Sequence, residues 1–174
     1  MFFSIIPFSS GTTALTLTTD ATGAVATVSA LGFGTAVNGI VPTTTNTGTT
    51  ITLPVGTTTE AFNVPRAGTI SAISATFTET TDVTLPTGTT ANITAQIYRA
   101  PAGSNVFTAT NAFVNLTPTA TGAVPAGTVY QGTTSTNVPV SAGDRLLLVY
   151  SVAGTGATAP VTLTGTGSAG ITIS

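Results

Sequence analysis

The most constraining feature of this chain is a succession of short strand-like segments separated by turn residues. Threonine supplies about a quarter of the 174 residues and, with Val and Ile, favours extended backbone because branching at Cβ restricts χ1. The segments are interrupted by 19 Gly and 10 Pro, in turn signals such as Asn38-Gly39 and Ala142-Gly143-Asp144 that recur about every dozen residues. Hardly any helical period of apolar residues is present. The pattern predicts a single all-β domain built as a sandwich or barrel.

Alternation within the segments predicts which faces are buried. It is strict from Ala91 to Tyr98, and the core face there comprises Ala91, Ile93, Ala95 and Ile97. Between Thr69 and Thr78 the apolar phase changes, which predicts a β-bulge near Ala72-Ile73. Further strands are expected at Ala24–Leu31, Thr50–Pro54 and Ala169–Ser174, with a loop at Thr43–Gly48.

The run Leu146–Tyr150 does not alternate, so both faces of this strand are expected to be buried. In one interpretation, one face meets the core and the other face, carrying Leu147 and Val149, meets a neighbouring subunit. In the other, a loop of the same chain covers a central strand. The sequence leaves both interpretations open.

The amino-acid composition excludes most kinds of catalytic site. The chain has no His and no Cys, so zinc, haem and iron–sulfur ligands of the usual kinds are absent, as are Ser-His-Asp and Cys-His constellations. Three basic residues are too few to neutralise a phosphate track, which argues against nucleic acid as a partner. We expect no enzyme activity, no catalytic residues, no metal site and no cofactor.

Scarcity of charge predicts self-association. Charged residues are 5% of the chain and the net charge is −2, against roughly 25% charged residues in an ordinary domain. The mean hydropathy is +0.49, yet no apolar run approaches the roughly 20 residues that a bilayer requires, so no membrane association is expected. A weakly charged, apolar surface offers little repulsion between copies, which favours an obligate oligomer.

Three stretches carry a resemblance to a known family: Ile5–Gly11 (IIPFSSG), Phe62–Ile70 (FNVPRAGTI) and Val138–Ser151 (VPVSAGDRLLLVYS). Together with the alternating strand that ends Ile97-Tyr98, they resemble the C-terminal domain of the collagen-like exosporium glycoproteins of bacterial spores, of the BclB type. The resemblance implies a jelly-roll β-sandwich similar to the tumour-necrosis-factor and C1q heads, assembled as a homotrimer.

The resemblance also implies a location on the spore surface, in the exosporium or an appendage. The expected partners are other copies of the chain, as a trimer or a polymer, and collagen-like spore-surface glycoproteins. No Gly-X-Y region precedes the domain, which suggests a head without a stalk. No basic residue precedes Arg66, so no signal peptide is visible.

The N-terminus is the most apolar segment. We divide the chain into an apolar arm (residues 1–10) and a jelly-roll domain (residues 11–174). Five large apolar side chains lie in the arm: Phe2, Phe3, Ile5, Ile6 and Phe8. Their burial represents on the order of 10 kcal/mol before ordering entropy. The arm is either an ordinary first strand of its own domain or a segment that docks into the next assembly and builds a fibre.

The ionisable residues favour structural roles. Glu79 and Asp82 are expected to be solvated turn charges. Arg66 and Arg99 are candidates for interface ion pairs with Glu60, Glu79 or Asp82, because Arg is the favoured interface cation.

Arg145, beside Asp144, either pairs with an acid across a trimer axis or ends an exposed turn. The tyrosines, Tyr98, Tyr130 and Tyr150, are expected in core or interface packing.

These observations favour a structural protein of the spore surface, a homotrimeric head that stacks into a fibre through its arm. The alternative is an adhesin or lectin-like binding module, which a cleft lined by Tyr with convergent Asn and Asp would favour. A phage or viral capsid-like jelly roll is a third possibility.

Overall fold

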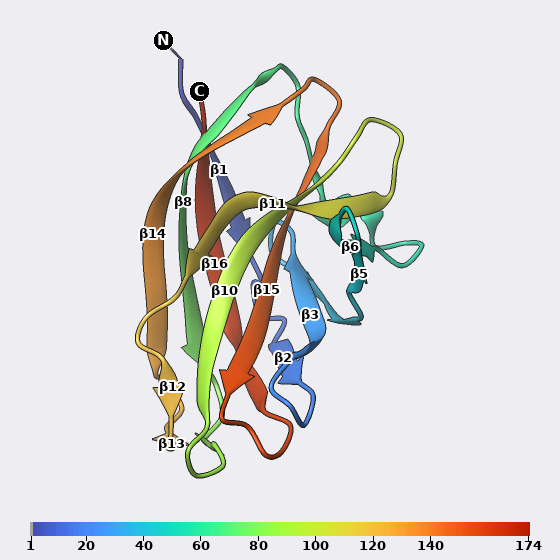
Figure 1. Ribbon diagram of the computed structural model, residues 1–174. Coiled ribbons are helices and arrows are strands. Elements are labelled where there is room, and N and C mark those ends of the chain that lie inside the picture. The colour runs from blue at the N-terminus through green and yellow to red at the C-terminus, as the bar shows by residue number, and fades with distance from the viewer. Residues whose placement is uncertain (1) are drawn as a thin grey trace.

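The computed structural model describes residues 2–174, which form sixteen β-strands, one short 3₁₀ turn (η1, Thr58–Glu60) and no α-helix (Figure 1). The long strands make two antiparallel sheets packed face to face. The first sheet has the order β14-β8-β16-β2, from β14 (Val129–Val140), β8 (Gly68–Glu79), β16 (Thr162–Ile173) and β2 (Leu15–Thr19). The second has the order β3-β15-β10-β11, from β3 (Val25–Leu31), β15 (Arg145–Thr155), β10 (Thr90–Ala100) and β11 (Val106–Asn115).

The connectivity of these strands is that of a jelly roll. Strand β10 pairs with β11, β8 with β14, β3 with β15, and β2 with β16, all antiparallel. In these four pairs, the strands that come earlier in the chain pair in reverse order with those that come later. The chain is therefore arranged as one long hairpin that is rolled into two sheets. This nesting distinguishes a jelly roll from a simple meander. The predicted all-β jelly-roll sandwich is confirmed.

Shorter strands extend and cover this frame. Strand β1 (Ser4–Ser9) lies beside β16 in the first sheet. The second sheet gains β4 (Ala36–Ile40), β5 (Thr43–Thr45), β6 (Gly48–Thr52), β7 (Phe62–Asn63) and β12 (Ala120–Thr121). Strands β9 (Val83–Thr84) and β13 (Ala123–Val124) pair in a separate two-stranded sheet at one end.

The main core lies between the two sheets. Phe77 contacts Tyr130 and Tyr150, with ring centroids 6.3 and 6.1 Å apart. The Tyr150 hydroxyl donates to the carbonyl oxygens of Thr76 (2.8 Å) and Ser168 (2.9 Å), so this side chain crosses from the second sheet to the first. A buried hydroxyl needs such partners because the unpaired group costs free energy in an apolar interior.

The predicted alternation in β10 is confirmed. The core face of this strand, Ala91, Ile93, Ala95 and Ile97, is at most 1% exposed. The predicted bulge in β8 is also present, one residue earlier than expected: Ile70 pairs with Ile173 and Ala72 with Thr172, which leaves Ser71 without a counterpart on β16.

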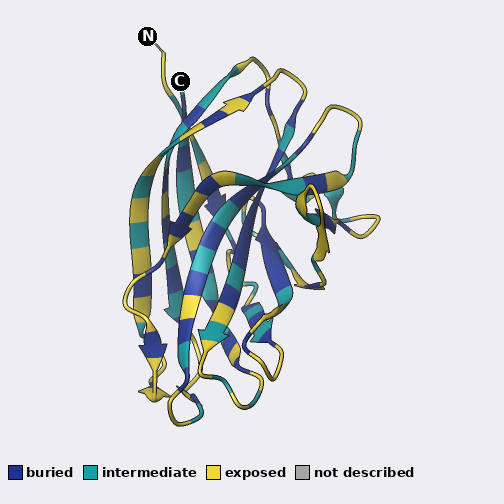
Figure 2. Ribbon diagram, in the orientation of Figure 1, coloured by how far each residue is buried: buried dark blue, intermediate teal, exposed yellow. Residues whose placement is uncertain are grey.

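The chain itself covers the outer face of β15. Leu147 (0% exposed) and Val149 (1%) belong to a second apolar cluster on the outer side of the second sheet. Its other members come from β3, the β4–β7 region, β10 and β11: Val28, Ala30, Ile40, Ile51, Leu53, Ala61, Tyr98, Ala100 and Phe107. Figure 2 shows β3 and β15 as the most continuously buried strands of this sheet. The interpretation in which a segment of the same chain covers this strand is therefore correct, and Leu147 and Val149 have no surface to offer a neighbouring subunit.

Two local predictions were wrong. The expected loop at 43–48 is a hairpin in which Thr43–Thr45 pairs with Gly48–Thr50. The expected turn at Asn38-Gly39 lies inside β4, where the Asn38 side chain accepts from the Ser29 hydroxyl (2.5 Å) and donates to the Ala14 carbonyl oxygen (2.7 Å). Asn38 therefore joins three segments, a role that turn statistics do not reveal.

Candidate assembly surface

Strand β1 is an edge strand of the first sheet. It pairs with β16 from Ser4 opposite Ile173 to Ser9 opposite Ser168. On its other side, among residues 2–174, only Ser9 is bridged, to Phe33. The backbone from Ser4 to Phe8 thus presents a sheet edge without a partner strand, in which Pro7 has no amide hydrogen and Ile5 keeps both its donor and its acceptor for another chain.

The side chains of β1 divide between two environments because a strand alternates its faces. Phe8 is 1% exposed and Ile6 packs partly buried against the main core. Phe2, Phe3 and Ile5 are 81%, 61% and 76% exposed. We call these three residues the β1 apolar face. The residues predicted to form an arm therefore split into the buried Phe8, the partly buried Ile6 and three exposed members.

The predicted division at residue 10 does not follow the sheet. Residues 4–9 are paired into the first sheet as an ordinary first strand would be, and Met1 lies outside the described residues. The sequence did carry a signal for the split: Ile6 and Phe8 share one strand phase, whereas Phe3 and Ile5 share the other.

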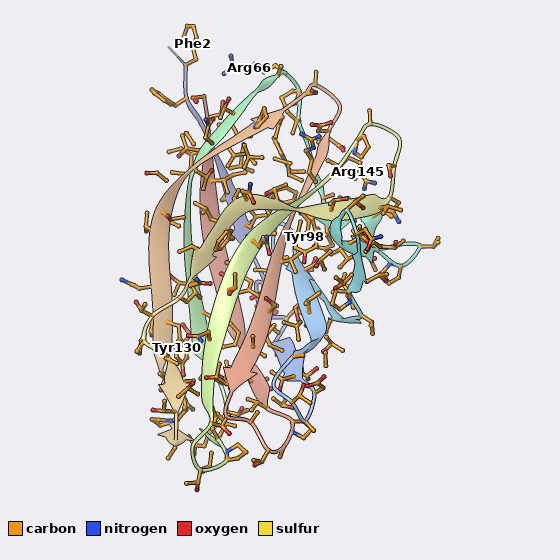
Figure 3. The ribbon with its side chains drawn as sticks, viewed as in Figure 1. Phe2, Arg66, Tyr98, Tyr130 and Arg145 are labelled. Carbon is orange, nitrogen blue, oxygen red and sulfur yellow. The ribbon has the colours of Figure 1, made fainter. Side chains whose placement is uncertain are left out.

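A small apolar hollow of about 50 Å³ lies beside β1, between Ile6, Phe62, Val64 and Ile173. Arg66 lies at its rim and is exposed. Figure 3 places Phe2 and Arg66 at the same end of the sandwich, near the two termini. The end that carries the β1 apolar face therefore also carries an exposed cation.

Arg145 is held within its own chain. Its guanidinium donates to the carbonyl oxygens of Thr58 (2.5 Å) and Ser104 (3.1 Å) and lies 5.3 Å from the centroid of the Phe107 ring. It thereby ties the first residue of η1 and the loop before β11 to the start of β15. These contacts favour an internal role for Arg145, and its pairing with an acid across a trimer axis stays a prediction.

Within residues 2–174, Arg99 pairs with Asp144 and with none of the predicted acids, and its ion pairs across a subunit interface stay a prediction. Its guanidinium lies 3.6 Å from the carboxylate of Asp144 and donates to the Pro139 carbonyl oxygen (2.9 Å). Glu60 instead accepts from the Thr35 hydroxyl (2.5 Å), and Asp82 from the backbone amide of Ala126 (2.8 Å).

Glu79 differs most from its prediction. It was expected to be a solvated turn charge, but its side chain is 1% exposed and neither carboxyl oxygen has a hydrogen-bond partner. Burial raises the pKa of Glu79 from its ordinary value of 4.5 to about 7, and the backbone of Thr164 opposes this shift only in part. The signal was available in the sequence, because Glu79 continues the core phase of Ile73, Ala75 and Phe77.

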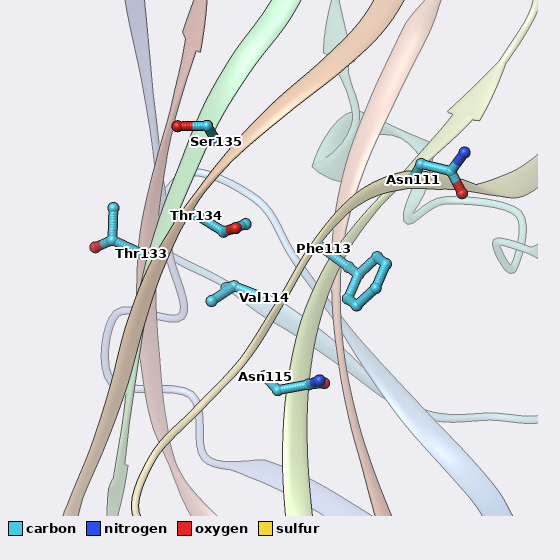
Figure 4. Close-up of a pocket in the computed structure, with 7 residues that line it drawn as sticks. All are labelled: Asn111, Phe113, Val114, Asn115, Thr133, Thr134 and Ser135. Carbon is cyan, nitrogen blue, oxygen red and sulfur yellow. The ribbon is translucent and has the colours of Figure 1, made fainter.

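An open groove runs between the edge strands β11 and β14 and has a volume of about 390 Å³. Asn111, Phe113 and Asn115 alternate along β11, and all three are exposed. Figure 4 shows these side chains on one side of β11, with Thr133 of β14 pointing the other way. The tyrosines take no part in such a groove, since Tyr98, Tyr130 and Tyr150 are 5%, 1% and 0% exposed.

Residues 2–174 show neither a cluster of metal ligands nor a membrane-spanning helix. Within residues 2–174, no three His, Cys, Asp or Glu side chains lie together as metal ligands. In the same part of the chain, no helix has the length and hydropathy to span a bilayer.

Comparison with known proteins adds little to this geometry. No protein-family model matches the chain, and no curated protein matches it. Among solved structures it is similar to the Eiger TNF from S. frugiperda, with 12% sequence identity and a TM-score of 0.45 over 99% of this chain and 92% of that one. The fold assignment therefore rests on the strand order and nesting described above.

Proposed function

We propose that this chain is a non-enzymatic structural protein that assembles with copies of itself through the β1 apolar face. The observation that carries the proposal is the exposure of Ile5 on β1, whose outer backbone edge is free from Ser4 to Phe8, and of Phe2 and Phe3 immediately before this strand. Three large apolar side chains side by side are costly to leave in water, at about 1.5–3 kcal/mol each. A free edge adds backbone hydrogen bonds to that driving force.

The charge distribution supports the same proposal. Of the three arginines, Arg99 and Arg145 are engaged within the chain, which leaves Arg66 as the exposed cation near the β1 apolar face. One charge next to an apolar strand does little to keep copies apart. A patch that docks on a different surface of the next copy produces a fibre, whereas a self-complementary patch produces a closed oligomer.

The biological setting is proposed from the sequence resemblance alone. The stretches at 5–11, 62–70 and 138–151 point to a homotrimeric head on the spore surface, in the exosporium or an appendage, that stacks head to tail. Collagen-like spore-surface glycoproteins are the proposed further partners. In such a material the chain acts by burying surface, and it requires no catalytic group.

The test is a substitution that removes the apolar face without touching the core. In the variant Phe2→Ser/Phe3→Ser/Ile5→Ser, the buried Ile6 and Phe8 remain. We expect the unmodified protein to form trimers or fibres, seen by light scattering and electron microscopy, and the variant to lose the fibres or dissociate. A matched control, Val41→Ser/Val55→Ser, removes two exposed apolar side chains elsewhere and should assemble normally. A wild-type protein that stays a single 17.1 kDa particle at high concentration would contradict the proposal.

The second candidate function is a glycan-binding module, favoured by the exposed Asn111-Phe113-Asn115 row. A ring that stacks on a sugar face between two amide groups is a common arrangement in binding sites. Binding on a glycan array that is lost in Phe113→Ala, while assembly is unchanged, would support this alternative. The absence of any glycan signal for the wild type would count against it.

A further inference from the structure

A buried acid and a buried phenol lie together at the end of the sandwich opposite the β1 apolar face. Glu79 is the last residue of β8 and Tyr130 is the second residue of β14; each is 1% exposed. Among residues 2–174, no group makes a hydrogen bond of good geometry to either carboxyl oxygen of Glu79 or to the hydroxyl of Tyr130, and the backbone of Thr164 makes only a weaker one to Glu79 that lowers its pKa in part. Figure 3 shows Tyr130 near β12, far from Phe2 and Arg66. Such unpaired buried groups are rare and require an explanation.

A small flap closes this end. We define the flap as residues 80–86 and 122–128, which include β9 and β13. Its attachment involves the backbone of Glu79: the Glu79 amide donates to the Thr128 carbonyl oxygen (2.9 Å), and the Gly127 amide donates to the Glu79 carbonyl oxygen (2.8 Å). Leu85 and Val124 of the flap are 3% and 5% exposed and pack in the main core. The flap therefore covers part of the core, and backbone hydrogen bonds attach it to the peptide groups of Glu79 and, through the Thr80 amide, to the Thr164 carbonyl oxygen (2.9 Å).

Among the described residues, no arginine faces the Glu79 carboxyl. Strand β14 contributes Tyr130, which has no positive charge, and β16 contributes the backbone of Thr164 and no ionisable side chain. The flap contributes Asp82, whose carboxylate accepts from the Ala126 amide within the flap. The arginines are elsewhere: Arg66 precedes the opposite end of β8, and Arg99 and Arg145 have the partners described above.

We propose that Glu79 and Tyr130 form a pH-operated latch, in which the neutral carboxyl holds the flap closed and its ionisation accompanies opening of the flap to water. The closed state suits a neutral carboxyl because an ionised one there has neither water nor a counterion. In the open state the carboxylate is hydrated, so its affinity for protons is ordinary. Neutral acid and phenol are tolerated next to each other in the core, whereas the negative charge of Glu79 raises the pKa of Tyr130 further above the value that burial produces.

The direction of the response follows from proton binding. Burial raises the pKa of Glu79 to about 7 in the closed state, and exposure returns it to the ordinary range. Between about pH 5 and pH 7 the open state therefore binds fewer protons than the closed state, and raising the pH favours opening. The ratio of open to closed flap should rise by up to about tenfold per pH unit in this interval and level off above it.

Hydrogen–deuterium exchange of the full chain, followed by mass spectrometry from about pH 5 to about pH 8 and corrected for intrinsic exchange, tests the latch. We expect protection of peptides covering 80–86 and 122–128 to fall by about 100-fold, while peptides from Ala91–Ile97 of β10 keep theirs. Glu79→Gln removes the ionisation and should hold flap protection constant with pH. Asp82→Asn, which removes a nearby charge but keeps its acceptor oxygen, should respond like the wild type.

Two results would overturn the latch: wild-type flap protection that does not change with pH, or a Glu79→Gln variant that keeps the wild-type response. The first measurement needs no variant, so it decides the question even where Glu79→Gln fails to fold. The latch does not depend on the proposed assembly, because the flap lies at the opposite end from the β1 apolar face.

Discussion

Phe8 of β1 stacks against Phe33, which follows β3, with ring centroids 5.8 Å apart and planes 19° from parallel. Backbone hydrogen bonds reinforce the contact: the Ser9 amide donates to the Gly32 carbonyl oxygen and the Gly34 amide to that of Ser9, each at 2.9 Å. Because one end of β1 is anchored in this way, the exposed residues at its other end are presented from a fixed strand.

Phe8→Ala should therefore destabilise the domain itself. Loss of a buried ring typically lowers the free energy of unfolding by about 3–5 kcal/mol, measurable by guanidinium-induced unfolding. Phe2→Ala, at an 81% exposed position, should change it by no more than about 0.5 kcal/mol. Equal effects of the two substitutions would show that β1 is not held in its own core.

Leu147→Ala should act within the chain and not on its assembly. The side chain fills the second apolar cluster, so truncation leaves a cavity and should lower the free energy of unfolding by about 2–5 kcal/mol. Light scattering at a protein concentration where the chain stays folded should give an unchanged particle mass. A smaller particle mass together with an unchanged free energy of unfolding would show instead that Leu147 lies at an interface between subunits.

Arg145→Met tests the internal role of the guanidinium. The substitution keeps an apolar stem over Phe107 but leaves the carbonyl oxygens of Thr58 and Ser104 without their donor. Unpaired acceptors of this kind cost about 1–3 kcal/mol, so thermal unfolding should occur at a lower temperature. Arg66→Met, at an exposed position, is the matched control and should leave the unfolding temperature nearly unchanged.

The pH dependence of global stability has a definite sign. The pKa of Glu79 is raised in the folded chain and ordinary in the unfolded chain, so the unfolded state binds fewer protons between about pH 5 and pH 7. The contribution of Glu79 to the free energy of unfolding should fall as the pH rises through this interval and level off above about pH 7. Denaturant unfolding gives this contribution as the difference between the free energies of unfolding of the wild type and of Glu79→Gln. A difference that does not change with pH would contradict a raised pKa of Glu79 in the folded chain.

Much of the strand pattern was predictable because it depends on neighbours along the chain. The alternation of β10 and the bulge in β8 follow from period-2 burial, and the unbroken apolar run of β15 indicates a strand with both faces buried. The same rule also indicates that Glu79 faces the core and that the side chains of β1 divide between two faces. Turn propensity predicts a solvated Glu79 instead, and the density of apolar residues predicts a separate arm, and both predictions are wrong for these side chains. The turn signal at Asn38-Gly39 also leads to a wrong prediction, because the side chain of Asn38 forms hydrogen bonds with Ala14 and Ser29, which are distant in sequence.

The sequence by itself determined the fold class, since a chain rich in β-branched residues and interrupted by Gly and Pro has few alternatives to paired strands. Only the tertiary structure decided which segments cover one another. Leu147 and Val149 are covered by the chain's own β3–β7 region, Arg145 donates to carbonyl oxygens of η1 and of the loop before β11, and the backbone of Glu79 bonds to the flap. Each of these outcomes depends on contacts between residues far apart in the sequence, which a strand's own pattern cannot specify because it records that a face is buried and not what buries it.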